Sequence, residues 1–117
     1  MRRVLFVFAL SICSLVAWAY DFSAVAPTGQ TLYYTITSDS TVEVSGDTTL
    51  TGSLTIPSTV VNGSTTYSVT SIGDSAFFQC SGLTSVTIPN SVTSLGTAAF
   101  NRCSGITAID IPNSVTI

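Results

Sequence analysis

The chain has 117 residues, of which 45% are hydrophobic and only 8% are charged, and it contains no histidine. Serine and threonine take the place of charge, since 18 Ser and 19 Thr together occupy 37 positions. Lysine is also absent, and the cations are Arg2, Arg3 and Arg102. This composition excludes nucleic-acid binding, which needs clustered Lys and Arg. It also excludes histidine-based acid–base catalysis and imidazole zinc sites.

The first 19 residues have the pattern of a secretory signal peptide. Arg2-Arg3 precedes an apolar run over residues 4–16, and Ala17-Trp18-Ala19 matches an A-x-A cleavage site. The run is shorter than the roughly 20 apolar residues that a membrane-spanning helix needs. We therefore expect cleavage after Ala19, no membrane span in the cleaved chain, and a secreted or cell-surface protein. Acylation of Cys13, as in a lipoprotein, is the alternative reading.

Residues 20–49 lack any repeat and predict a β-rich N-terminal cap. Strands are expected at Thr31–Ile36 and Thr41–Val44, where apolar and polar residues alternate. If Tyr33 and Tyr34 share a strand, one of them faces away from the core. That tyrosine either contacts a ligand or is covered by a neighbouring hairpin.

Residues 50–71 contain a partial copy of a repeat with a segment inserted into it. Leu54-Thr55-Ile56-Pro57 matches residues 86–89, and the stretch beginning at Val69 matches the one at Val92. The insertion is centred on Asn62-Gly63, a strong signal for a two-residue β-hairpin turn. We expect this hairpin to complete the cap.

A 23-residue repeat accounts for the rest of the chain, because residues 72–94 and 95–117 are identical at 13 of 23 aligned positions. The V-x-I step predicts one short strand in each unit, and Pro-Asn-Ser predicts the turn that follows it. Residues 97–101 leave room for about one helical or 3₁₀ turn. Such a unit buries its apolar side only by stacking on its neighbour. The last unit has nothing after it to stack on, so we interpret the chain as a truncated piece of a longer array.

The repeated pattern A-F-x-x-C-S-G-L/I-T-x-V/I-x-I-P-N-S-V-T-x-I/L-G begins at Ala76 and again at Ala99. It resembles the BspA-like, or Treponema pallidum-type, leucine-rich repeats of bacterial surface proteins, and the likeness covers Leu54–Ile117. Residues 21–27 are similar to the leader region of such proteins from the Bacteroidota. The resemblance implies a curved solenoid with a parallel sheet on one face, and adhesion or ligand binding at the cell surface.

The expected fold is thus an α/β repeat solenoid, with short parallel strands and short helical or 3₁₀ segments, after a β-rich cap. Residues that recur in register are expected to form its core. These are Phe77, Cys80, Leu83, Val86, Ile88, Phe100, Cys103, Ile106, Ile109 and Ile111. Cys80 and Cys103 either form a ladder of buried thiols or pair as a disulfide, for which Cα atoms about 5 Å apart would suffice. The parallel Cβ directions favour the ladder.

Thr55, Thr87 and Asp110 fall at equivalent strand positions that point away from the core, and they are the candidate binding-face residues. No motif for catalysis, metal or cofactor binding accompanies them, so we expect no enzymatic activity and no cofactor. The expected function is non-covalent, adhesion-type binding of an unidentified protein or glycan by an exported repeat protein. The alternative is a structural spacer that presents another domain and binds nothing itself.

Overall fold

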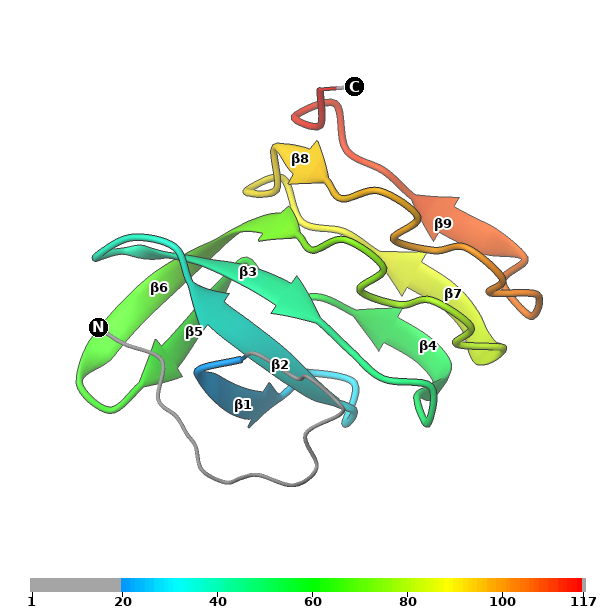
Figure 1. Ribbon diagram of the computed structural model, residues 1–117, viewed down its shortest axis with the longest axis horizontal. Helices are drawn as coiled ribbons and strands as arrows, with labels where there is room; N and C mark the ends of the chain where they lie inside the picture. The colour runs from blue at the N-terminus through cyan, green and yellow to red at the C-terminus, as the bar shows by residue number, and fades with distance from the viewer. Residues whose placement is uncertain (1–19, 117) are drawn as a thin grey trace.

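The computed structural model describes residues 20–116, so the predicted signal peptide lies outside the described residues. Nine strands form two sheets that lie side by side (Figure 1). The larger sheet has the order β1-β2-β3-β6-β5, with β8 also paired to β6, and the smaller has the order β4-β7-β9. The strands are β1 (Phe22–Val25), β2 (Thr31–Ile36), β3 (Thr41–Ser45), β4 (Thr51–Thr55), β5 (Thr59–Asn62), β6 (Thr65–Ile72), β7 (Gly82–Thr87), β8 (Ser94–Leu95) and β9 (Ala108–Asp110).

The N-terminal part is an antiparallel meander in which β1 pairs with β2 and β2 with β3. The strands expected at residues 31–36 and 41–44 are present as β2 and β3. Alternation along β2 buries Leu32 and Tyr34, which are 0% and 1% exposed, and leaves Tyr33 on the outer side. The meander joins the repeats because β3 pairs in parallel with β6.

The hairpin expected around Asn62-Gly63 is confirmed as β5 and β6. Asn62 pairs with Thr65, so Gly63 and Ser64 are the two central residues of the turn, and Gly63 has the positive φ, 64°, that the first central position of such a hairpin turn requires. The hairpin places Tyr67 against Phe22, with ring centroids 5.9 Å apart. It therefore covers the inner side of the meander, opposite to the side on which Tyr33 lies.

The repeats stack with all matching strands parallel. β4 pairs with β7 and β7 with β9, while β6 pairs with β8 on the other side of the core. Gly96 marks a close approach between successive repeats, because a Cβ there would collide with the backbone of Gly73 and Asp74. This contact explains why glycine occupies the repeated position.

No helix is present in residues 20–116, which corrects the expectation of short helical or 3₁₀ segments. The segments that follow β6 and β8 are turns, with φ of 54° at Ser75, 60° at Gln79, 58° at Ala98 and 65° at Arg102. In the turn after β6, the N–H groups alternate between two kinds of acceptor. Those of residues 76, 78 and 80 bond within the turn, whereas the others donate to the next repeat, as Ser75 to Thr97, Phe77 to Ala99 and Gln79 to Asn101. Bonds to a neighbouring repeat preclude the i to i−4 pattern of a helix.

Hydroxyl groups also connect the repeats. Ser91 Oγ donates to Val69 O at 2.7 Å, and the equivalent Ser114 Oγ donates to Val92 O at 2.7 Å. Threonine hydroxyls repeat the arrangement, with Thr93, Thr107 and Thr116 each donating to the carbonyl 23 residues earlier. The high Ser and Thr content therefore supplies hydrogen bonds between repeats as well as polar surface.

In residues 20–116 no helix is long and apolar enough to cross a membrane.

Candidate functional site

The three residues predicted to form the binding face lie in one row across the smaller sheet. Thr55 on β4 is opposite Thr87 on β7, which is opposite Asp110 on β9. Thr87 and Asp110 are exposed and Thr55 is half-buried. The structure thus brings together three residues that are 32 and 23 positions apart in the sequence. Neighbouring strands lie about 4.8 Å apart, so the row extends about 10 Å.

A second polar row runs beside the first, with Ser53 opposite Ser85 and Ser85 opposite Ala108. Ser85 Oγ donates to Ser53 Oγ at 2.9 Å, and this bond joins two repeats. We call the outward residues of the two rows the sheet face; they are Ser53, Thr55, Ser85, Thr87, Ala108 and Asp110. The sheet face carries one carboxylate, several hydroxyls and no cation.

The residues between the two rows point inward and show how burial changes along the stack. Leu54 and Val86 are each 1% exposed, but Ile109 at the same register position is 37% exposed. Ile111 is 45% exposed, whereas its counterpart Ile88 is 4% exposed.

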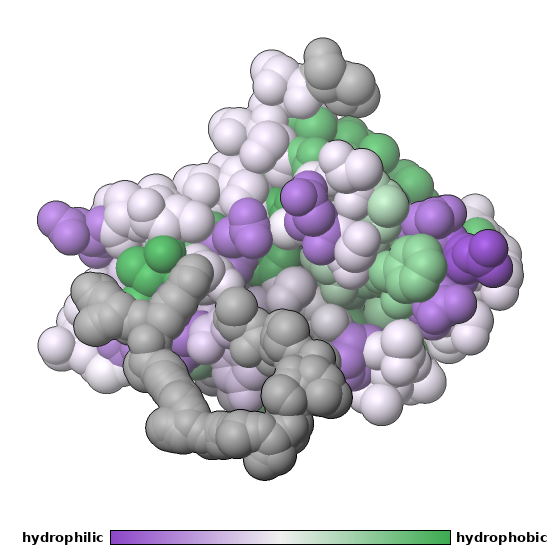
Figure 2. Space-filling model, viewed as in Figure 1, coloured by the Kyte–Doolittle hydropathy of each residue, from purple (hydrophilic) through white to green (hydrophobic). Residues whose placement is uncertain are grey.

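The core predicted for the last repeat is therefore confirmed only in part, and the prediction is wrong for Ile109 and Ile111. Phe77, Cys80, Leu83, Val86 and Ile88 are buried as expected, but Ile109 and Ile111 are exposed, and Phe100, Cys103 and Ile106 are half-buried. The physical reason is that each repeat is covered by the one after it, and no described residue covers the last. Figure 2 shows the resulting hydrophobic side chains near β9 and the C-terminal end.

The two edges of the smaller sheet differ. At the β4 edge, Gln30 Nε2 donates to Thr51 O and to Ser53 O, each at 2.9 Å. Thr28 Oγ1 accepts from Thr55 N at 3.1 Å. The loop between β1 and β2 thus satisfies three outward backbone groups of β4, as a further strand would do. We call Gln30 and Thr28 the edge clamp.

Cys80 and Cys103 are unpaired, and each thiol donates to a backbone carbonyl of the layer before it, which is the cap for Cys80 and the preceding repeat for Cys103. Cys80 Sγ lies 3.0 Å from Asp47 O, and Cys103 Sγ lies 2.8 Å from Phe77 O. The structure thus contains the thiol ladder rather than the disulfide. Burial raises the pKa of the Cys80 thiol to about 12, with smaller contributions from Cys103 and Asp47, so this thiol is poorly nucleophilic at neutral pH.

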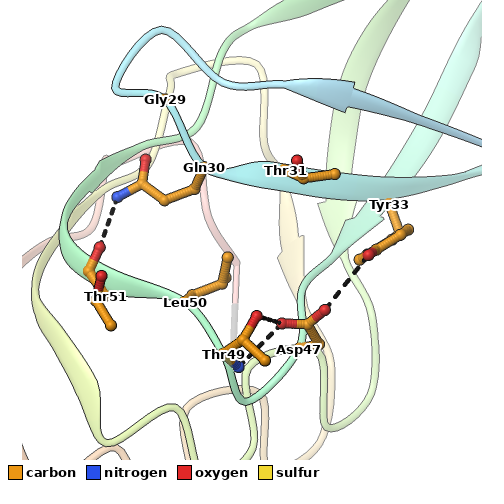
Figure 3. Close-up of a pocket in the computed structure, with 8 residues that line it drawn as sticks. All are labelled: Gly29, Gln30, Thr31, Tyr33, Asp47, Thr49, Leu50 and Thr51. Atoms are coloured by element: carbon orange, nitrogen blue, oxygen red, sulfur yellow. Dashed lines mark hydrogen bonds between the residues drawn. The ribbon is translucent and has the colours of Figure 1, made fainter.

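A depression of about 410 Å³ lies between the outer side of β2 and the turn that joins β3 to β4 (Figure 3). Tyr33 and Thr31 project into it from β2, and Asp47 and Thr49 face them from the turn. We call it the Tyr33 depression; it is lined by Gly29, Gln30, Thr31, Tyr33, Asp47, Thr49, Leu50 and Thr51.

Asp47 has a fixed orientation in this depression. Its Oδ1 accepts from Thr49 N at 3.0 Å and from the Thr49 hydroxyl, while the Tyr33 hydroxyl donates to Oδ2 at 3.4 Å. Burial raises the pKa of the Tyr33 phenol, and the Asp47 charge and hydrogen bond raise it further. The Tyr33 ring also contacts Tyr20, with centroids 4.7 Å apart and planes inclined by 55°.

Sequence reasoning found that one of two tyrosines faces outward but missed Asp47 as its neighbour. The alternation of β2 was the available signal for Tyr33, whereas the 14-residue separation from Asp47 gave none. In residues 20–116, no group of three or more Cys, Asp or Glu side chains is placed to hold a metal ion.

Residues 58–117 match the family model described as the BspA type leucine rich repeat region. A search of curated proteins finds no match. Among solved structures, a leucine-rich repeat protein from Bacteroides ovatus is similar over 83% of this chain, with 34% identity and a TM-score of 0.70. One from Bacteroides capillosus is similar over 68% of this chain, with 32% identity and a TM-score of 0.61.

A third similar structure is described as a leucine rich cell surface protein from Faecalibacterium prausnitzii, with 28% identity over 80% of this chain and a TM-score of 0.59. These three proteins extend beyond the matched region. The chain spans 25%, 59% and 24% of their respective lengths.

Proposed function

Because the chain belongs to the BspA-type leucine-rich repeat family, we propose that it is an exported repeat protein that binds a protein or glycan non-covalently through the sheet face. Export is supported by the signal-peptide pattern of residues 1–19. A cell-surface location is further supported by the description of the Faecalibacterium prausnitzii relative.

The observation that carries the proposal is the register of the sheet face. Thr55, Thr87 and Asp110 align across three parallel strands, although only the first two are chemically alike. In a repeat array, each further unit adds one more outward position to the same row. A row of this kind offers a partner many weak polar contacts, and variation such as Thr87 against Asp110 gives the row its specificity.

The charge distribution narrows the class of partner. The sheet face carries the Asp110 carboxylate, and residues 20–116 contain one cation, Arg102, against six acidic residues. A polyanion is therefore repelled, whereas a neutral glycan or a protein surface with basic and hydroxyl groups is complementary.

The test is a binding screen of the protein against purified extracellular-matrix proteins and a glycan array, followed by surface variants. Thr87→Arg places bulk and positive charge in the centre of the row and Asp110→Arg places them at its β9 end, and we expect each to weaken binding by tenfold or more. Thr65→Arg, on the β5–β6 hairpin, is the matched control and should bind as the wild type does.

Two results would contradict the proposal. Binding that survives both Thr87→Arg and Asp110→Arg would place the partner elsewhere on the molecule. A screen without any partner would favour the structural spacer, which projects another domain and has no ligand of its own.

A further inference from the structure

We propose that the Tyr33 depression, at the N-terminal end of the molecule and separate from the sheet face, binds a neutral sugar ring. Its volume of about 410 Å³ is in the range of small-molecule sites. It lies where the outer side of β2 meets the β3–β4 turn and the start of β4, so most of its lining residues belong to the N-terminal cap rather than to the repeats.

The lining chemistry favours a ligand that carries many hydroxyl groups. Thr31, Tyr33, Thr49 and Thr51 supply hydroxyls, and Asp47 supplies a carboxylate. No lining residue is a cation, so Asp47 would repel an anionic ligand. A metal ion is also disfavoured, because one oxygen of Asp47 is already occupied by Thr49 and metals such as Ca²⁺ take about six to eight oxygen ligands.

The Tyr33 ring provides the aromatic part of the site, and the Tyr20 ring packs against it from outside the lining residues. They meet at 55° with centroids 4.7 Å apart, and Tyr20 is 41% exposed. Tyrosine combines an apolar ring with a polar hydroxyl, which matches a pyranose, whose C–H groups form an apolar patch beside its hydroxyls. Leu50, which is 5% exposed, adds an aliphatic contact among the polar lining residues.

Asp47 is already oriented for such a ligand. Thr49 N and the Thr49 hydroxyl fix Oδ1, so the carboxylate loses little freedom on binding. The remaining oxygen, Oδ2, has a contact of 3.4 Å with the Tyr33 hydroxyl, which is long for a bond between two oxygens. A sugar hydroxyl that donates to Oδ2 would form a shorter bond and could accept one from Tyr33.

The experiment is saturation-transfer difference NMR on the protein with the methyl glycosides of galactose, glucose, mannose and N-acetylglucosamine, and with sialic acid as the anionic comparison. We expect at least one neutral glycoside to receive saturation, most strongly at its ring C–H protons, with a Kd of about 1 mM. We expect none for sialic acid. If no neutral glycoside binds at about 10 mM, or if sialic acid binds more strongly, the proposal is wrong.

Variants separate this site from the sheet face. Tyr33→Ala should abolish the signal, and Asp47→Asn should weaken binding about tenfold. Asp47→Asn keeps an acceptor for Thr49, and Tyr33→Phe keeps the ring, so these variants control for misfolding. Thr87→Arg lies on the sheet face and should leave glycoside binding unchanged. Binding that is unaffected by Tyr33→Ala, or that is lost in Thr87→Arg, would overturn the assignment.

Discussion

Phe77 and Phe100 occupy the same position in successive repeats, and their rings stack with centroids 5.3 Å apart and planes 6° apart. Phe77 is 0% exposed, whereas Phe100 is half-buried because no described residue covers the last repeat. Two phenylalanines at the same repeat position thus differ in how far their side chains are buried.

This difference predicts unequal effects of two identical substitutions. Phe77→Ala should lower the free energy of unfolding by about 3–5 kcal/mol, the usual cost of removing a buried phenylalanine. Phe100→Ala should cost roughly half as much, because part of its ring already contacts solvent. Urea denaturation of both variants measures the two values. Equal losses would contradict the burial gradient along the stack.

The turns between strands predict a stabilising substitution. Ala98 is exposed and has a φ of 58°, a conformation that costs an L residue with a side chain about 1 kcal/mol. Ala98→Gly removes this cost, and we expect a gain in unfolding free energy of roughly 0.5–1 kcal/mol. The neighbouring Ala99 is 5% exposed and its φ is not positive, so Ala99→Gly is the matched control. Ala99→Gly should destabilise the protein, and a gain in both variants would contradict the argument.

Much of the fold follows from the sequence because two full copies of the repeat can be aligned with each other. Identity at 23-residue spacing aligns Thr87 with Asp110, and parallel stacking then puts them in one row, which the structure confirms. The Asn62-Gly63 hairpin is a local signal and is confirmed for the same reason, since a two-residue turn depends on few neighbours.

The features that sequence reasoning missed depend on contacts between distant segments. The turns at Ser75 and Ala98 were expected to be helical, because nothing local shows that the N–H groups of the Ser75 turn alternate between their own turn and the next repeat. The contact of Tyr33 with Asp47 and the clamp of Gln30 on β4 join residues 14 to 23 positions apart that share no motif. Such contacts can be identified only once the three-dimensional arrangement of β2 and β4 is known.

Burial of Cys80 predicts a loss of stability at alkaline pH. The pKa of its thiol rises from 9.0 to about 12 on folding, so above pH 9 the unfolded chain loses a proton that the folded chain keeps. The free energy of unfolding should therefore fall as the pH rises from about 9 to 12. Burial also raises the pKa of Tyr34, from 10.0 to about 12, which adds to the fall above pH 10.

Two variants separate these contributions. Cys80→Ala should remove the part of the fall that begins near pH 9, and Tyr34→Phe the part that begins near pH 10. Denaturant titrations at each pH unit from 7 to 11 provide the measurement. A stability that rises with pH in this window would contradict the assignment, as would a Cys80→Ala profile parallel to that of the wild type.

The edge clamp predicts that Gln30 prevents a second copy of the chain from pairing with β4. Its amide donates to the carbonyls of Thr51 and Ser53 at the outer edge of β4, so few hydrogen-bonding groups remain there for a second chain, whereas within residues 20–116 no strand pairs with the outer edge of β9. In Gln30→Ala both carbonyls lose this partner, and β4 of one copy could then add in parallel to β9 of another, as β4 already pairs with β7. We expect a loss of about 1–2 kcal/mol in unfolding free energy and concentration-dependent association.

Analytical ultracentrifugation over a range of protein concentrations tests this association, with Gln79→Ala as the control. Gln79 is an exposed glutamine in the turn that precedes β7, so its replacement should change neither stability nor mass. Gln30→Glu sharpens the test, because a carboxylate cannot donate to the two carbonyls and its charge repels them. If Gln30→Ala and Gln30→Glu both remain monomeric and as stable as the wild type, the clamp does not protect the edge.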